Sequence, residues 1–356
     1  MKRVFFQLFL FISIFSAGAN SSNYLFRNLS TDNGLICTQV HAILEDDNGF
    51  LWVGTTDGLN RYDGFTFKKY IPDIADKNSI QAYNISNLFQ DENGLIWIFF
   101  SSGELSYYNP LTGKFTNFSN QQLKRILPAF SKTTCFFKGN SKQTFIGTTG
   151  GLLIFDHQTK QLSPVKTKES FVATADISHI TTDAQNNIWF ATSEGIVRYS
   201  TSTEKFYNYS LLNASISYIF VDTTNKIWVG TTNAGLYKLR FNNKHKLYYS
   251  KISTVGNRIF QILEGSKNEI WISTNKGVSV FNCADNTCKL KQTYFNSGNF
   301  YYISNELFKS EILKDNAGNI WFGDFKVENG ILYYSNKRKQ IESILVDAQN
   351  PYSLQQ

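Results

Sequence analysis

One short phrase built around tryptophan recurs along the whole chain, and its spacing constrains the fold more than any other feature. The chain has 356 residues and six tryptophans, each in a phrase that resembles "LWVGTT" of residues 51–56. A seventh phrase, "TFIGTTGGL", has Phe145 in the place of the tryptophan. The seven anchors lie between 39 and 50 residues apart: Trp52, Trp97, Phe145, Trp189, Trp228, Trp271 and Trp321. A catalytic loop would occur once, whereas a repeat of this period indicates an array of similar structural units.

Each unit has the same internal order. An alternating run such as "VHAILED" (40–46) leads into a turn with Gly or Asn three residues before the anchor, except in the third unit, where Lys142 stands. Both residue types tolerate the positive φ of tight hairpin turns. The anchor strand follows this turn. A second glycine then begins the third strand, and a final strand such as "FTFKKY" completes the unit. Four short strands per unit predict an all-β fold, a seven-bladed β-propeller of four-stranded antiparallel blades.

The repeated side chains are expected to have structural roles. Aromatic residues at fixed places fill cores, so the anchors are predicted to pack between neighbouring blades. Glycines 54, 147, 230 and 323, two residues after their anchors, are predicted to allow close packing. The repeated aspartates stand six residues before their anchors: Asp46, Asp91, Asp183, Asp222 and Asp315. We expect these carboxylates to bond their own turn backbone rather than to form a ring of catalytic acids.

The two ends of the chain raise separate questions. Residues 1–19 read as a signal peptide, because Lys2 and Arg3 precede an apolar stretch and the small-residue pattern Ala17-Gly18-Ala19. The propeller is assigned to residues 20–347. A ring of blades needs a closing strand, and both "YLFRNLS" (24–30) and "KQIESIL" (339–345) are candidates. Residues 348–356 resemble the start of a further, truncated repeat, because "VDAQNPYSLQQ" is similar to residues 71–84.

Charge and cysteine content restrict the function classes. The formal net charge is +7, but the basic residues are scattered, so no nucleic-acid partner is expected. Cys283 and Cys288 bracket a predicted hairpin turn and form a candidate disulfide. The CxxxxC spacing alone supplies two ligands and no third, so no metal site is expected there, and no cofactor is expected. Cys37 and Cys135 are expected to be small buried side chains.

Candidate functional residues are few. His41 and His179 fall on or near predicted innermost strands, but no catalytic constellation stands out in the sequence. The connections between blades are irregular, and ligands bind in such loops. The connection 294–306 is rich in aromatic residues, which stack on sugars. The candidate ligand-binding residues are Phe300, Tyr301 and Tyr302, together with Arg125, Asp324 and Lys326.

The first unit resembles a known family. "FRNLSTDNGL" followed by "VHAILEDDNGFLWVGTTDGLNRYDGFTFKKY" is similar to the start of the periplasmic sensor region of hybrid two-component systems, the two-component regulator propeller of Bacteroidetes. The resemblance extends over residues 24–347, and it is looser in the second and third units. In that family two propellers precede an immunoglobulin-like domain, a membrane helix, a histidine kinase and a receiver.

The resemblance implies a non-enzymatic sensor of polysaccharide-derived oligosaccharides in the periplasm, within a longer receptor anchored in the inner membrane. A second propeller, the kinase parts and a second copy of the chain are then the expected partners. Two alternatives stay open. One is a freestanding secreted carbohydrate-binding propeller. The other is a propeller lyase, such as the streptogramin lyases, which have seven blades.

Overall fold

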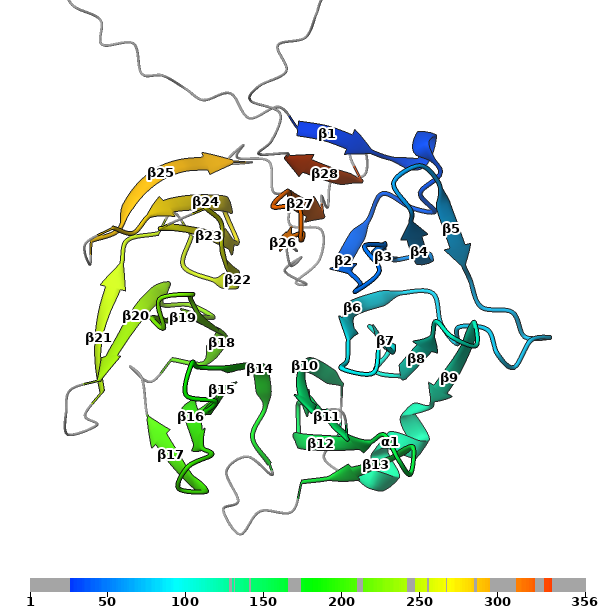
Figure 1. Ribbon diagram of the computed structural model, residues 1–356, viewed down its shortest axis with the longest axis horizontal. Helices are drawn as coiled ribbons and strands as arrows, with labels where there is room; N and C mark the ends of the chain where they lie inside the picture. The colour runs from blue at the N-terminus through cyan, green and yellow to red at the C-terminus, as the bar shows by residue number, and fades with distance from the viewer. Residues whose placement is uncertain are drawn as a thin grey trace, which may run out of the picture.

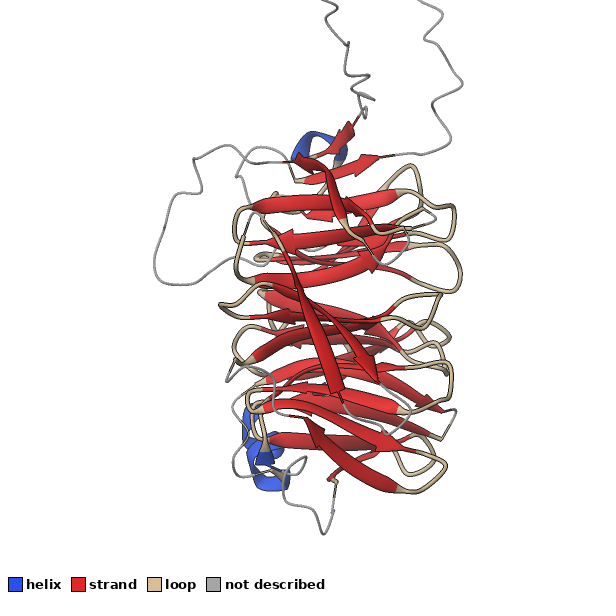
Figure 2. Ribbon diagram, turned by 90° about the vertical axis from the view of Figure 1, so that its left-hand side faces the viewer, coloured by secondary structure: helices blue, strands red, loops and turns tan. Residues whose placement is uncertain are grey.

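The computed structural model describes most of the chain. The described residues are 26–127, 130, 132–140, 142–165, 174–209, 214–241, 247–254, 256–266, 268–284, 287–294, 312–323 and 330–334. They form antiparallel four-stranded sheets arranged around a common axis (Figure 1). In side view the sheets give a flattened disc with turns on both faces (Figure 2). No helix in the described part of the chain is long and apolar enough to cross a membrane.

The first three blades follow one another along the chain, and each contains four consecutive strands. Blade 1 contains β2 (Val40–Glu45), β3 (Leu51–Thr55), β4 (Gly58–Tyr62) and β5 (Phe67–Tyr70). Blade 2 contains β6 (Ile85–Gln90), β7 (Ile96–Phe100), β8 (Leu105–Asn109) and β9 (Lys114–Phe118). Helix α1 (Asn120–Ile126) leads to blade 3, which contains β10 (Thr133–Asn140), β11 (Gln143–Thr148), β12 (Gly151–Asp156) and β13 (Gln161–Pro164).

The next three blades repeat this order. Blade 4 contains β14 (Ile177–Thr182), β15 (Ile188–Thr192), β16 (Gly195–Ser200) and β17 (Lys205–Tyr209). Blade 5 contains β18 (Ile216–Val221), β19 (Ile227–Thr231), β20 (Leu236–Phe241) and β21 (Leu247–Ile252). Blade 6 contains β22 (Ile259–Glu264), β23 (Glu269–Thr274), β24 (Gly277–Asn282) and β25 (Lys289–Tyr294).

The blade count predicted from the sequence needs a correction. Six blades, not seven, are built from four consecutive strands, and the remaining sheet is a composite of both chain ends. It contains β26 (Ile312–Lys314), β27 (Ile320–Gly323) and β28 (Ile331–Tyr334), and its outer strand is β1 (Phe26–Leu29), which precedes a short 3-10 turn, η1 (Thr31–Asn33). The number of anchor phrases does not reveal this composite sheet, because the unit around the last anchor, Trp321, obtains its fourth strand from the other end of the chain.

The N-terminal strand closes the ring, as one of the two candidate segments predicted. Strand β1 pairs antiparallel with β28, from Phe26 opposite Tyr334 to Leu29 opposite Ile331. The competing segment 339–345 lies outside the described residues. A second contact closes the ring near the axis, where the amide of Asn316 donates to Glu45 Oε2 over 2.6 Å.

The repeated aspartates and tryptophans form hydrogen-bonded pairs, four of them buried. One carboxylate oxygen accepts backbone amides of its own turn, as Asp46 Oδ1 does from Asn48 and Phe50. The other oxygen accepts the indole N–H of the anchor tryptophan at 2.7–2.9 Å. The pairs are Asp46–Trp52, Asp91–Trp97, Asp183–Trp189, Asp222–Trp228 and Asp315–Trp321. The predicted turn role is therefore confirmed, and the indole bond adds to it a direct link between turn and core.

The predicted close packing of the glycines is also confirmed. A Cβ added to Gly54 would lie 2.4 Å from Ile85 Cγ2 of the next blade, and one added to Gly230 would lie 2.6 Å from Ile259 Cγ2. Gly147 faces Cys135 and Ile177 in the same way, and Gly323 faces Val40 across the closing seam. The buried tryptophans fill the space beside these contacts, so the blades are held together by apolar packing.

Candidate functional site

The innermost strands of the blades all begin on one face of the disc. Strands β2, β6, β10, β14, β18 and β22 surround the axis (Figure 1). Near their starts, the second residues of β14 and β18 donate to the carbonyls of the first residues of the next inner strands. The turns at the far ends are hydrogen-bonded between blades 1 and 2 and between blades 5 and 6. The strands therefore run side by side in one direction, and the residues that precede them form a circle around the axis.

These preceding residues form what we call the polar ring: Gln39, Asn84, Lys132, Asp176, Ser215 and Arg258. The carbonyl of each accepts a backbone N–H from the turn between the second and third strands of its own blade. The donors are Thr56, Ser101, Thr149, Ser193, Thr232 and Asn275, at 2.9–3.3 Å. This bond fixes each backbone and leaves the side chain to vary, so the ring combines a rigid scaffold with diverse chemistry.

The side chains of the polar ring suit a polar ligand. Asn84, Lys132 and Asp176 are exposed, and the other three members are half-buried. Two amides, a hydroxyl, two cations and one carboxylate provide both hydrogen-bond donors and acceptors. Beside them, Tyr83 is 53% exposed, and the Arg258 guanidinium lies 5.6 Å from the ring centre of Phe260.

The second residue of each of these strands lies in a β-bulge, and in three neighbouring blades it bonds to the next blade. Ser178 Oγ donates to the carbonyl of Ile216, and Ser217 Oγ donates to the carbonyl of Ile259, both over 2.6 Å. Thr134 makes the same contact with Ile177. The bulge turns these hydroxyls toward the neighbouring strand, so the inner wall is cross-linked just below the polar ring.

His41 occupies this second position in blade 1. It hydrogen-bonds with the backbone of Ile85 and with the side chain of Asn84, both in blade 2. Burial lowers the pKa of His41 below its usual value, and the two hydrogen bonds offset part of that effect. His41 is therefore a neutral side chain that links two blades and supports Asn84 of the polar ring.

His179 lies one position further along its strand, in blade 4. Its ring stacks on that of Tyr218 from blade 5, with centroids 3.7 Å apart and planes 28° apart. Both side chains are half-buried. The two sequence candidates for the axis are thus in place on the innermost strands, and each contacts the neighbouring blade.

The other candidate ligand residues fall elsewhere. Arg125 is exposed in the last turn of α1, which lies at the outer edge beside β13 (Figure 1). The structure does not bring Arg125 into the polar ring. Phe300, Tyr301, Tyr302, Asp324 and Lys326 lie outside the described residues.

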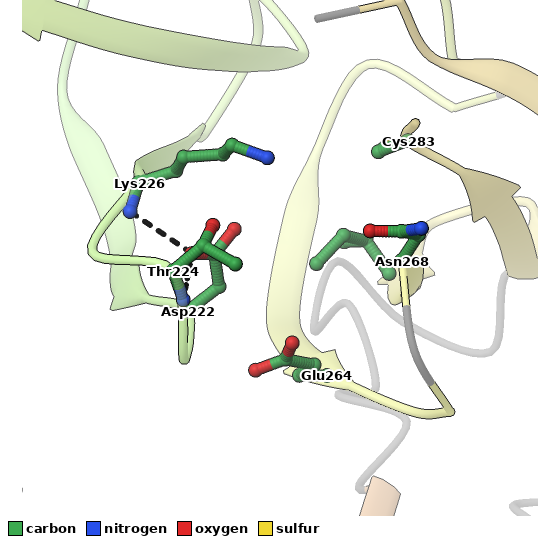
Figure 3. A pocket seen from close by; sticks show the side chains of 7 residues that line it. Asp222, Thr224, Lys226, Glu264, Asn268 and Cys283 are labelled. Carbon is green, nitrogen blue, oxygen red and sulfur yellow. Dashed lines mark hydrogen bonds between the residues drawn. The ribbon is translucent and has the colours of Figure 1, made fainter. Parts of the chain in front are cut away.

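The opposite face carries the aspartate turns and one small recess between blades 5 and 6 (Figure 3). Asp222, Thr224 and Lys226 line one side of the recess, and Glu264, Asn268 and Cys283 line the other. Asp222 is occupied by its turn and by Trp228, and Glu264 accepts from the amide and hydroxyl of Thr223. Cys283 is disulfide-bonded to Cys288. The described residues contain no cluster of three or more His, Cys, Asp or Glu that suits a metal ion.

Sequence reasoning missed the polar ring. Its members share a position but no residue type, so a search for repeated letters passes over them. A usable signal exists, because each member directly precedes the alternating run of its unit. Aligning the units on their anchors would have found this variable position within an otherwise regular phrase.

Comparison with known proteins supports the family resemblance. Residues 34–57 match the family model described as "Two component regulator propeller". The resemblance to that family is confirmed. The matched segment ends in β3 and the turn after it, and it contains the Asp46–Trp52 pair that recurs in four other sheets. The match thus covers part of one blade of the ring.

A histidine kinase carries a similar segment. The chain is 45% identical over 73 residues to "Histidine kinase P4" of Formosa agariphila. That alignment covers 20% of this chain and 5% of the kinase, so the matched region is a small part of a much longer protein.

Solved structures show the same fold. One is the extracellular domain of BT3049 from B. thetaiotaomicron, described as a hybrid two component system, with a TM-score of 0.68 and 22% identity. The similarity covers 88% of this chain and 42% of that domain, so the chain spans less than half of its length. A virginiamycin B lyase from Staphylococcus aureus has a TM-score of 0.62 and 13% identity over 88% of this chain and 99% of the lyase. At these identities the likeness is one of fold.

Proposed function

We propose that this chain is the ligand-sensing propeller of a hybrid two-component receptor and that it functions in the periplasm. The regulator-propeller match over residues 34–57 carries the proposal, together with the related segment of a histidine kinase. The fold shared with the extracellular domain of BT3049 agrees with it. The chain itself is proposed to have no enzymatic activity and to act through a second propeller and kinase parts of a longer receptor.

The proposed ligand is an oligosaccharide derived from a polysaccharide, bound at the polar ring. Sugars offer hydroxyls to amides and charged groups, and they stack their apolar faces on aromatic rings. In the polar ring, Asn84, Lys132 and Arg258 can hydrogen-bond to sugar hydroxyls. Tyr83, next to the ring, offers an aromatic face for stacking. Binding by the isolated chain is expected to be weak, because in the resembled family the ligand contacts can involve both propellers.

Saturation-transfer NMR tests this proposal, because the method detects weak binding. The chain is mixed with panels of neutral and acidic oligosaccharides, and the bound sugars give a difference signal. Lys132→Ala is expected to weaken binding about tenfold, in line with the loss of a hydrogen bond to a charged group.

Lys138→Ala is the matched control, because the half-exposed Lys138 lies near the far end of β10, the strand that Lys132 precedes, and contacts Glu92 at 3.9 Å. It is expected to leave the signal unchanged. Equal effects of the two substitutions would place the ligand elsewhere. No signal from any saccharide, with this chain and with the whole ectodomain, would overturn the proposal.

A lyase is the second candidate function. The fold shared with virginiamycin B lyase and the two histidines on innermost strands favour it. A lyase needs a base that can approach its substrate, whereas His41 and His179 both contact the neighbouring blade. Turnover of a streptogramin or a uronic-acid polysaccharide that is lost in His41→Ala or His179→Ala would establish this function in place of sensing.

A further inference from the structure

Blade 3 is one of two blades that lack the aspartate–tryptophan pair, and its seam with blade 2 contains a histidine. Phe145 replaces the anchor tryptophan, and Gly139 stands where an aspartate would bond it. At the seam between blades 2 and 3, the Asp91 carboxylate of blade 2 instead faces the imidazole of His157 from blade 3.

His157 is held in a tight turn between β12 and β13. Its amide donates to the carbonyl of Lys142 over 2.8 Å, and its Nε2 lies 2.9 Å from Thr144 Oγ1. The same Nε2 lies 3.6 Å from Asp91 Oδ2, and the ring stands edge-on to Phe155. The imidazole is thus surrounded by its own blade on one side and by blade 2 on the other.

Asp91 is buried and already well satisfied. Its Oδ1 accepts the amides of Asn93 and Leu95, and its Oδ2 accepts the indole N–H of Trp97 over 2.7 Å. The carboxylate is therefore fixed in place. Its Oδ2 faces His157 across the seam.

The second imidazole nitrogen decides what protonation does. His157 Nδ1 is buried and has no hydrogen-bond partner among the described residues. A neutral ring protonated at Nε2 leaves only an unpaired acceptor there. A charged ring adds a buried N–H without an acceptor, which costs about 1–3 kcal/mol or more in proteins.

The charges around His157 come from three side chains. Asp91 in blade 2 and Asp156 in the same turn favour the charged imidazole, whereas Lys160 in that turn opposes it. Burial has the largest effect, and the net result is a pKa of His157 below its usual value.

We propose that the packing of His157 against Asp91 of blade 2 is a pH-sensitive link between blades 2 and 3: the buried turn stays closed while His157 is neutral and loosens when mild acid protonates it. The turn has an exposed outer half, because Gln158, Thr159 and Lys160 are exposed. Lifting this turn gives Nδ1 access to water without dismantling the core of the blade. The inference concerns the seam alone and does not depend on which ligand the polar ring binds.

The sign of the effect follows from the pKa direction. A lowered pKa means that the unfolded or opened form binds the proton more tightly. The link is fully stabilising above the ordinary histidine pKa, and its contribution is lost as the pH falls through the lowered value. Local opening of β12 and β13 is therefore expected to increase in mild acid.

Hydrogen-exchange mass spectrometry of the whole chain tests the proposal, with exchange rates corrected for their intrinsic pH dependence. Protection of residues 151–164 is expected to fall about threefold to tenfold between pH 7.0 and pH 5.5. Protection of β20 and β21 in blade 5 serves as the internal reference. In His157→Gln the drop at residues 151–164 is expected to disappear, whereas the control His179→Gln is expected to keep it.

Two outcomes would overturn the proposal. One is unchanged protection of residues 151–164 in the wild-type chain, or a drop of the same size in His157→Gln. The other comes from NMR titration of the wild-type imidazole, which needs no variant: a pKa of His157 at or above the ordinary histidine value contradicts the link.

Discussion

Blades 5 and 3 have the same four-stranded architecture but different polar contacts. In blade 5, Asp222 bonds Trp228, and the Lys238 ammonium lies 5.4 Å from the centre of the same indole. In blade 3, Phe145 and Gly139 replace the aspartate–tryptophan pair, and His157 reaches the aspartate of blade 2. Gly230 and Gly147 make the same close contacts in both. The glycine and apolar packing therefore builds a blade, and the aspartate–tryptophan pair strengthens it.

The largest expected difference between the two blades concerns their anchors. Trp228→Ala is expected to destabilise the protein by about 3–5 kcal/mol, because a fully buried indole leaves a cavity and Asp222 loses its partner. Phe145→Ala is expected to cost less, since Phe145 is only half-buried. Urea unfolding of both variants measures the two costs. Equal costs would mean that the aspartate–tryptophan pair adds nothing to blade 5.

The glycines should show what the blades have in common. Gly230→Ala and Gly147→Ala are both expected to cost about 1–3 kcal/mol, because the added methyl meets Ile259 in one case and Cys135 with Ile177 in the other. Thermal unfolding measures both. Combining Gly147→Ala with Cys135→Ala is expected to restore part of the stability, since the nearest clashing atom is Cys135 Sγ at 2.4 Å. Additive losses in that double variant would contradict the steric explanation.

The polar contacts of the two blades are expected to contribute different free energies to stability. Asp222→Asn keeps one oxygen for the turn amides and is expected to cost about 1–2 kcal/mol, through the bond to Trp228. Thr144→Val in blade 3 removes a neutral hydrogen bond to His157 and is expected to cost about 1 kcal/mol. Chemical denaturation at pH 7.5 compares them. A larger loss for Thr144→Val would reverse the ranking of the two blades.

The smallest expected difference is in pH dependence. Burial lowers the pKa of Lys238, and nearby Lys226 and Arg240 add to this effect. Its contribution to stability is therefore present above the ordinary lysine pKa and is lost as the pH falls through the lowered value. Relative to Lys238→Met, the wild-type chain is expected to gain stability between about pH 9 and pH 11, whereas the contribution of His157 changes in mild acid. Parallel stability curves above pH 9 would contradict this assignment.

Much of the ring could be predicted from the sequence because its signals are local. The period of the anchors, the turn glycines and the turn asparagines each depend on a few adjacent residues. Asn186, Asn225 and Asn268 indeed adopt the positive φ that their positions predicted. The disulfide partners Cys283 and Cys288 are also local, since they are five residues apart.

The candidate site was harder to predict because its residues come from different blades. Asn84 is hydrogen-bonded to His41 of the preceding blade, and the imidazole of His157 lies next to the Asp91 carboxylate at the seam between blades 2 and 3. Each of these pairs joins residues that are more than forty positions apart. No periodic pattern marks them, because variation between units is what gives each blade its own chemistry.

The sequence by itself determined the repeated unit, its buried anchors and the strands that each unit supplies. The hydrophobic alternation and the turn residues specify these within one unit, through short-range sterics and hydrogen bonds. Only the tertiary structure decided that six blades are continuous and that the last sheet is shared between the chain ends. It also decided which polar side chains surround the axis and which histidine meets a buried carboxylate. These features depend on ring closure, which brings together residues whose contacts are not encoded in any single unit.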